Sequence, residues 1–299
     1  MSGRHGSFLG CHGIAVDPPP WGERLGQTDG TPLADLRVDR LEDPVVPTDA
    51  QRVWRIEEVG QELWRNGDGD SWLTVEGKTA LRMDALLGWV RLAPMGEAIA
   101  LQLLTTFVIP RLAQEAGAVV VHAASFARDG RAVVVCAESG GGKSSLVVAM
   151  AEHGWRVLSE DLTAISIGAA GAAVWPGPPW VRLHPDALVP SGWQSCFTAG
   201  DKTGWSLEGK MAEQPAALAG LVFLEAPGGP RPTSDSLAPA AAVAGLARHL
   251  PWTGDPEERA SRLFPGAVRL AGAAPARTLR LPVSSSWATL AAGELGRDS

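Results

Sequence analysis

The residues of this chain that are best suited to chemistry form one short stretch, CAESGGGKSS, at positions 136–145. An apolar run, RAVVVC (131–136), leads into it, and a segment with helical spacing, SSLVVAMAEHG (144–154), follows it. Glycines let backbone N–H groups approach phosphate oxygens without obstruction by a Cβ atom, and a helix N-terminus adds unpaired N–H groups. The stretch therefore predicts a phosphate-binding loop between a strand and a helix; the alternative is a simple flexible turn.

The loop pattern gives its residues separate roles. Lys143 would reach the β- and γ-phosphates of a nucleotide, and Ser144 would ligate Mg²⁺. The usual pattern begins with glycine, but here its first position is Ala137, which suits the loop where φ is negative. The predicted nucleotide-binding residues are Glu138, Ser139, Gly140, Gly141, Gly142, Lys143, Ser144 and Ser145.

Two acids follow at the end of an apolar segment, VLSEDL (157–162). One of Glu160 and Asp161 could hold Mg²⁺, and the other could accept a proton from an attacking hydroxyl group. Adjacent residues of a regular strand point to opposite faces, so both can serve one site only if the backbone bends there. The alternative is an exposed turn.

Three further residues are candidates. His122 lies in an apolar run, AVVVHAASF (118–126), where the alternative is a packed core histidine. Arg182 could clamp a phosphate or a substrate carboxylate, and Lys202 could neutralise transition-state charge; surface side chains are the alternative for both. Near the start, His5, Cys11 and His12 lack the spacing of a zinc site.

Taken together, these residues resemble the catalytic domain of the HPr kinase/phosphorylase family. The resemblance lies in His122, then ESGGGKSS, then HGWRVLSEDLTAI (153–165), and extends over about residues 118–290. Two segments, WPGPPWVRLHPDAL (175–188) and DKTGWSL (201–207), are similar to relatives from peptide-modification clusters, some of which phosphorylate a serine of a lasso-peptide precursor.

The resemblance implies an ATP-dependent serine kinase that uses Mg²⁺. It places Glu160 as the proton acceptor, Asp161 beside the metal, His122 near the γ-phosphate and Lys143 on the transferring group. The acceptor would be a serine of a peptide or protein, such as a precursor peptide. The alternatives are a kinase of a small hydroxyl compound (free serine or a sugar) and a nucleotide-binding switch without catalysis, which Ala137 favours.

The expected fold class is α/β (α+β). Residues 1–105 would form a β-rich N-terminal domain with a connecting helix, and residues 106–299 a P-loop kinase domain like that of phosphoenolpyruvate carboxykinase. Short alternating runs between 52 and 77 predict an antiparallel sheet, and 95–116 predicts a helix that Pro110 kinks or divides. Residues 1–50 are rich in Pro and Gly and weakly patterned, with turn or extended segments at 18–21 and 43–47, and 168–180 and 227–239 predict linkers.

Composition limits the possible partners and compartment. The chain has 299 residues, of which 45% are hydrophobic, and a net charge of −7, which argues against a nucleic-acid partner. Its three cysteines are sparse, no signal peptide is apparent, and no apolar run reaches the ~20 residues of a membrane span. We therefore expect a cytoplasmic protein without membrane contact, whose N-terminal domain binds a partner or completes a homo-oligomer.

Overall fold

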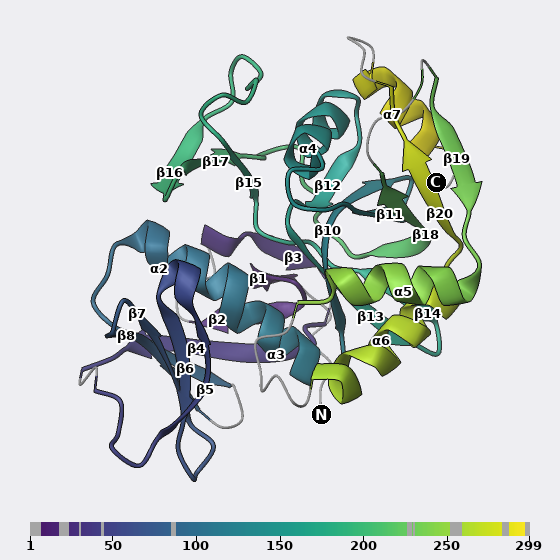
Figure 1. Cartoon of the computed structure of the whole chain (residues 1–299). Helices are drawn as coiled ribbons and strands as arrows, with labels where there is room; N and C mark the ends of the chain where they lie inside the picture. The colour runs from purple at the N-terminus through teal and green to yellow at the C-terminus, as the bar shows by residue number, and fades with distance from the viewer. Residues whose placement is uncertain are drawn as a thin grey trace.

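The computed structural model describes residues 7–17, 24–29, 31–42, 45–84, 88–225, 229, 231–251, 259–282 and 287–296 (Figure 1). They form a mixed α and β structure with several sheets, in agreement with the predicted α+β class. His5 and the segment 18–21 lie outside the described residues.

An N-terminal sheet occupies one side of the molecule (Figure 1). Its strand order is β3-β1-β2-β4-β9-β8-β7-β6-β5. The predicted antiparallel meander is confirmed in β5 to β8, and Asn66 and Asp70 close the β6–β7 hairpin. The strands are β1 (Ser7–Cys11), β2 (Ile14–Asp17), β3 (Gln27–Asp29), β4 (Ala34–Arg40), β5 (Gln51–Ile56), β6 (Gln61–Arg65), β7 (Ser71–Val75), β8 (Lys78–Met83) and β9 (Trp89–Leu92).

Strands β1 to β4 form within the first fifty residues, where the sequence shows only weak patterning. Strands β1 to β3 have three to five residues each, and β2, β4 and β9 pair in parallel, so residues far apart in the sequence complete each other's ladders. Such pairing depends on long-range contacts rather than on local alternation of polar and apolar residues. The sequence of this segment therefore carries only a weak strand signal.

One helical segment follows the sheet: α2 (Glu97–Leu103), a π-helical turn η2 (Leu104–Val108) and α3 (Ile109–Glu115). Pro110 has no N–H group to donate to the preceding turn, and the wider turn η2 comes directly before α3. The helical segment is thus continuous, with a change of winding where a kink or break was predicted. The predicted domain boundary at 105/106 falls inside η2, and the division into domains stays a prediction.

The central sheet contains the phosphate-loop segment. Strands β11, β10, β13, β14 and β18 follow one another, and β18 also pairs in parallel with β11, so these five close into a ring. The segments expected to be linkers, 168–180 and 227–239, instead contain β14 and β19. The strands are β10 (Val119–Arg128), β11 (Arg131–Cys136), β12 (Arg156–Ser159), β13 (Leu162–Gly168), β14 (Gly171–Val174), β18 (Ala216–Leu224), β19 (Thr233–Ser236) and β20 (Ala276–Arg280).

Helices cover both sides of this sheet (Figure 1). On one side α4 (Lys143–Glu152) and α7 (Trp287–Leu295) enclose a buried cluster that includes Trp155. On the other side α5 (Pro239–His249) and α6 (Arg259–Ala273) enclose a second cluster. The helix α4 follows β11 and ends before Gly154, as predicted from the sequence.

A small sheet, with the order β15-β17-β16, packs near α4 and carries two candidate residues. Arg182 lies on β15 (Trp180–Leu183), and Lys202 begins β17 (Lys202–Ser206). The third strand is β16 (Ser195–Ala199). Because β15 follows the acids by about twenty residues, this sheet can return a basic side chain to them.

The N-terminal sheet shares a core with the central sheet. Val120, Leu162 and Trp175 belong to the same buried cluster as residues of β2, β4, β7 and α3. At the edge of this core the segment around Gly177 runs between His12 and Ser159. A Cβ atom on Gly177 would lie 2.6 Å from Ser159 Oγ and 2.9 Å from His12 Cε1. The joint therefore tolerates no side chain at this position.

We predict that Gly177→Ala lowers the free energy of unfolding by about 1–3 kcal/mol, because an added methyl group must displace a packed neighbour. The matched control is Gly168→Ala, where a Cβ atom meets nothing within 4 Å. We expect it to change the free energy by less than about 1 kcal/mol. Urea unfolding followed by circular dichroism measures both, and equal effects would contradict the close approach.

Candidate functional site

The predicted phosphate loop lies between β11 and α4, as the sequence indicated. Gly140 and Gly142 adopt left-handed backbone conformations, with φ of 75° and 86°, and a Cβ atom on either would meet nothing within 4 Å. Ala137 is buried and is not among the described non-glycine residues with positive φ. Alanine is therefore compatible with the first position of this loop, and the backbone around the glycines is open to a ligand.

Lys143 opens α4 and turns back over the loop. Its Nζ donates to the carbonyl oxygen of Ala137 at 2.5 Å and to that of Glu138 at 3.4 Å. Burial lowers the pKa of Lys143, and nearby carboxylates oppose that shift. Since an α-helix leaves its first N–H groups without intrahelical acceptors, the ammonium and the start of α4 together form a site for an anion.

The two acids occupy a break between strands. Strand β12 ends at Ser159 and β13 begins at Leu162, and Ser159 Oγ donates to the Leu162 carbonyl oxygen across the break at 2.5 Å. Glu160 and Asp161 therefore lie outside the regular alternation that would point them to opposite faces. The backbone bend that a shared site requires is present.

Each acid contacts a different partner. Ser144 Oγ donates to Glu160 Oε1 at 3.0 Å, which joins the phosphate loop to the acids. His122 Nε2 lies 2.9 Å from Asp161 Oδ1. Arg182 links the two, with Nη2 at 2.5 Å from Asp161 Oδ2 and Nε at 3.7 Å from Glu160 Oε2. The fold thus brings together five residues that the sequence singled out.

The surroundings move the pKa values of the two acids in opposite directions. Burial and the neighbouring charge of Asp161 raise the pKa of Glu160 from 4.5 to about 7. Burial would also raise the pKa of Asp161, but the hydrogen bond with His122 and the charge of Arg182 outweigh it and lower that pKa to about 2. Near neutral pH, Asp161 is ionised and Glu160 can exchange a proton.

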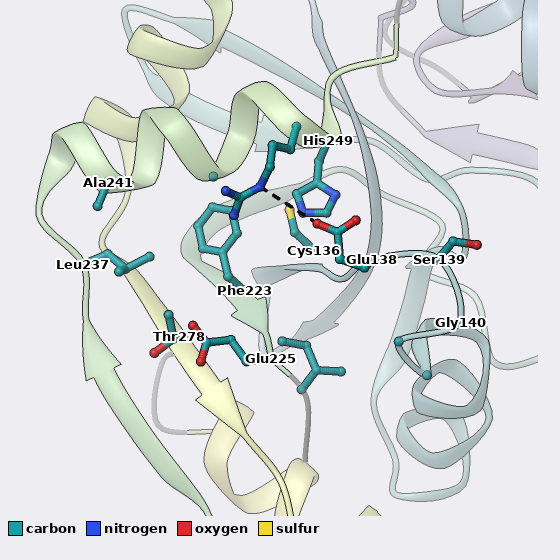
Figure 2. Close-up of a pocket in the computed structure, with 15 residues that line it drawn as sticks. Cys136, Glu138, Ser139, Gly140, Phe223, Glu225, Leu237, Ala241, His249 and Thr278 are labelled. Atoms are coloured by element: carbon teal, nitrogen blue, oxygen red, sulfur yellow. Dashed lines mark ion pairs between the residues drawn. The ribbon is translucent and has the colours of Figure 1, made fainter. Parts of the chain in front are cut away.

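A cavity of about 670 Å³ begins at the loop, in the size range of ligand sites (Figure 2). Figure 2 shows Glu138, Ser139 and Gly140 of the loop on one side, and Phe223, Leu237 and Ala241 on the other. The cavity therefore has a loop end with a backbone suited to phosphate and an apolar end. Its other lining residues are Cys136, Gly141, Gly142, Leu224, Glu225, Gly245, Arg248, His249 and Thr278.

A second cavity, of about 620 Å³, lies between the acids and the N-terminal sheet. His122 and Asp161 line one part of it, and side chains of β5, β7 and the helix α2–η2 line another. Arg248 and His249, at the end of α5, line both cavities. The site therefore has two compartments that meet at Arg248 and His249.

Three residues of this region had no role in the sequence analysis. His12 is buried beside the acids, with a left-handed backbone (φ 55°), and its Nδ1 has no hydrogen-bond partner among the described residues. Arg248 Nε lies 3.9 Å from Glu138 Oε1, drawn as a dashed line in Figure 2, and the His249 ring faces Phe223 at 6.3 Å. Only the tertiary fold brings His12 to the acids and the other two residues to the loop, and no local sequence pattern predicts these positions.

The remaining candidates are less closely engaged. Lys202 lies near enough for its charge to oppose the raised pKa of Glu160, with burial and Asp161 the larger causes of the shift. Ser145 is exposed on the first turn of α4. In the part of the chain that the structure describes, no group of three or more His, Cys, Asp or Glu side chains could hold a metal ion. A phosphate-bound Mg²⁺ needs only one or two protein ligands, which Ser144 and an adjacent carboxylate can provide.

No protein-family model and no curated protein sequence matches the chain. Among solved structures, the chain is similar to the Hpr(Ser) kinase/phosphatase from Coxiella burnetii, with 12% sequence identity and a TM-score of 0.32. The similarity covers 60% of this chain and 97% of that one. Because this TM-score is below 0.5, we base the functional proposal on the geometry of the site alone. Among the described residues, no helix has the length and apolar character to cross a membrane.

We predict that Glu160→Gln stabilises the protein at pH 8 and that this gain disappears towards pH 5. Between pH 4.5 and about 7, a carboxyl group whose pKa is raised on folding is protonated in the folded state and ionised in the unfolded state. The free energy of unfolding therefore falls as pH rises through that range. Each pKa unit corresponds to about 1.4 kcal/mol, so the gain at pH 8 is about 3–4 kcal/mol.

Urea unfolding at several pH values from 5 to 8 measures this difference. Glu208→Gln, at an exposed position, is the control for loss of one negative charge. A difference between Glu160→Gln and the parent that does not change with pH would contradict the raised pKa of Glu160.

Proposed function

We propose that the chain is an ATP-dependent kinase that transfers the γ-phosphoryl group to a serine hydroxyl of a peptide or protein. The observation that supports this most is the hydrogen bond between Ser144 and Glu160, because it joins a phosphate-binding loop to an acidic pair. A loop that served only as a turn could contain left-handed glycines, but it would not need a buried carboxylate on its serine.

The nucleotide would bind along the first cavity. Its phosphates would accept hydrogen bonds from the loop backbone and from the N–H groups at the start of α4, with Lys143 providing a positive charge. Its base would pack against the apolar end near Phe223, Leu237 and Ala241. This arrangement uses the whole length of the cavity and points the terminal phosphate towards the acids.

Mg²⁺ would be held beside the phosphates by Ser144 and one carboxylate. The resemblance gave this role to Asp161. Because the acid in contact with Ser144 is Glu160, we assign to Glu160 the carboxylate beside Ser144 and Mg²⁺. When bound, Mg²⁺ neutralises charge on the phosphate oxygens. Asp161 contacts both His122 and Arg182, and it would orient the ring of His122.

The transfer itself requires a nucleophile and a proton acceptor. The serine Oγ would form a bond to the γ-phosphorus, the bond from that phosphorus to the bridging oxygen would break, and the nucleoside diphosphate would leave. We assign the hydroxyl proton to His122, whose half-exposed ring lines the second cavity and is oriented by Asp161. Glu160, the predicted acceptor, has a pKa of about 7, so the experiment below tests both assignments.

We predict that Lys143→Ala greatly weakens ATP binding, because the phosphates lose a positive charge. We expect His122→Gln to keep ATP binding but to lower the rate of phosphoryl transfer about 10²–10⁴-fold, as for the loss of a general base. Glu160→Gln should instead raise the Mg²⁺ concentration that gives half-maximal rate. The measurements are calorimetric ATP titration and transfer from γ-labelled ATP to mixed synthetic peptides with one serine each.

The outcomes of that experiment separate the possible functions. A large loss of rate in Glu160→Gln, with none in His122→Gln, would return the base to Glu160. Labelled serine or sugar, tested in parallel, would indicate a small-molecule kinase. ATP binding without turnover would indicate a nucleotide-binding switch, and the absence of ATP binding in the parent would contradict the whole proposal.

A separate prediction tests where the nucleobase of ATP lies. Ala241→Phe fills the apolar end of the first cavity and should weaken ATP binding about tenfold or more, because a buried nucleoside loses its space. Binding of inorganic triphosphate, which needs only the loop, should not change. Ala240→Phe is the matched control, since Ala240 is exposed on the same helix and outside the cavity lining. Equal effects of both variants would contradict this placement.

A further inference from the structure

The second cavity identifies the side from which the acceptor approaches. His122 and Asp161 line it, whereas the loop residues Glu138 to Gly142 line the first cavity. Attacking and leaving oxygens lie roughly in line in phosphoryl transfer, so the acceptor must come from the side opposite the nucleotide. On the proposed function, the second cavity is the compartment that remains for it.

The wall of this cavity that the N-terminal sheet and the helix α2–η2 form is largely apolar, although Gln61 and Thr106 also line it. Trp54 and Phe107 pack edge to face there, with ring centroids 6.2 Å apart, and Leu73 and Leu103 continue the surface. An acceptor as small and polar as free serine or a sugar would leave this wall in contact with water. A large apolar group beside the hydroxyl would bury it, which favours binding.

A strand edge borders the same cavity. In the described part of the N-terminal sheet, β5 is the last strand and pairs with β6 on one side. Trp54 and Ile56, two residues apart on β5, both line the cavity, and Ile56 is 43% exposed. An extended peptide can add to such an edge by main-chain hydrogen bonds and direct alternate side chains into the neighbouring pocket.

We infer that the acceptor is an extended peptide that pairs with the edge of β5 and places a large apolar side chain, close to its serine, in the second cavity. This inference rests on the proposed kinase function and adds the chemical class of the acceptor. The serine then faces His122 and the terminal phosphate. A long-chain alcohol would match the apolar wall but could not use the strand edge.

The test is a binding measurement that needs no phosphoryl transfer. The full-length protein, with Mg²⁺ and a non-hydrolysable ATP analogue, is titrated with short fluorescent peptides that carry one serine flanked by either phenylalanine or glutamine. We expect the phenylalanine peptide to bind about tenfold more tightly or better, the range for one buried apolar side chain. N-methylation of alternate peptide nitrogens should weaken binding in one register only, as main-chain pairing to a strand edge requires.

Variants locate the preference in the cavity. Trp54→Ala should reduce it to about threefold or less, and Ile56→Ala, a milder change at an exposed position, should reduce it in the same direction. Trp89→Ala removes a tryptophan from the same sheet outside the cavity and should keep the full preference. ATP affinity and the circular dichroism spectrum check that each variant is folded.

Several results would overturn the inference. These are equal binding of the two peptides, a preference that survives Trp54→Ala and Ile56→Ala, no register dependence of N-methylation, or binding of dodecanol as tight as that of the best peptide. In each case ATP binding and its dependence on Lys143 would be unaffected. Failure of the kinase proposal would instead appear in the parent protein as no ATP binding, or as ATP binding without transfer to any peptide, so the two failures are distinguishable.

Discussion

Two adjacent carboxylates, one buried and the other partly buried, are the constraint on which this structure depends. Removing a single charge from water costs several kcal/mol, and two like charges side by side repel each other. The chain meets this cost with Arg182 between the acids, His122 on Asp161 and a serine hydroxyl on Glu160. Because one acid keeps its charge and the other is poised near neutral pH, the pair can divide two chemical tasks.

That arrangement dictates which elements must meet. The arginine comes from β15, the histidine from β10 and the serine from α4, so three elements converge on the break between β12 and β13. Closure of the ring through the β11–β18 pairing fixes β11, and therefore the loop, relative to β10. The geometry of the candidate site is thus a property of the sheet, and the loop alone would not produce it.

The local patterns were sufficient for this central region. The strand–loop–helix order around Lys143 and the acids after the next strand were predicted from glycine spacing and apolar runs, and the structure places them as expected. Strands β2, β4 and β15 were not predicted, because their pairings join distant segments. Arg248 and His249 were missed for the same reason, since only the packing of α5 on β18 places them at the loop. The helix α6 was not predicted either, and it contains Pro265, a residue that usually interrupts helices.

The N-terminal sheet is part of the site wall, for a reason visible at His12. This residue holds a left-handed backbone, and its buried ring lies against the Gly177 segment beside the acids. Burial lowers its pKa to about 4, so the ring adds no positive charge that would compete with Arg182 for the carboxylates. The neutral, buried ring lines a cavity of about 20 Å³ next to the acids, whereas the second cavity has a volume of about 620 Å³. The same sheet lines the second cavity through β5, so its position sets the access to the acids.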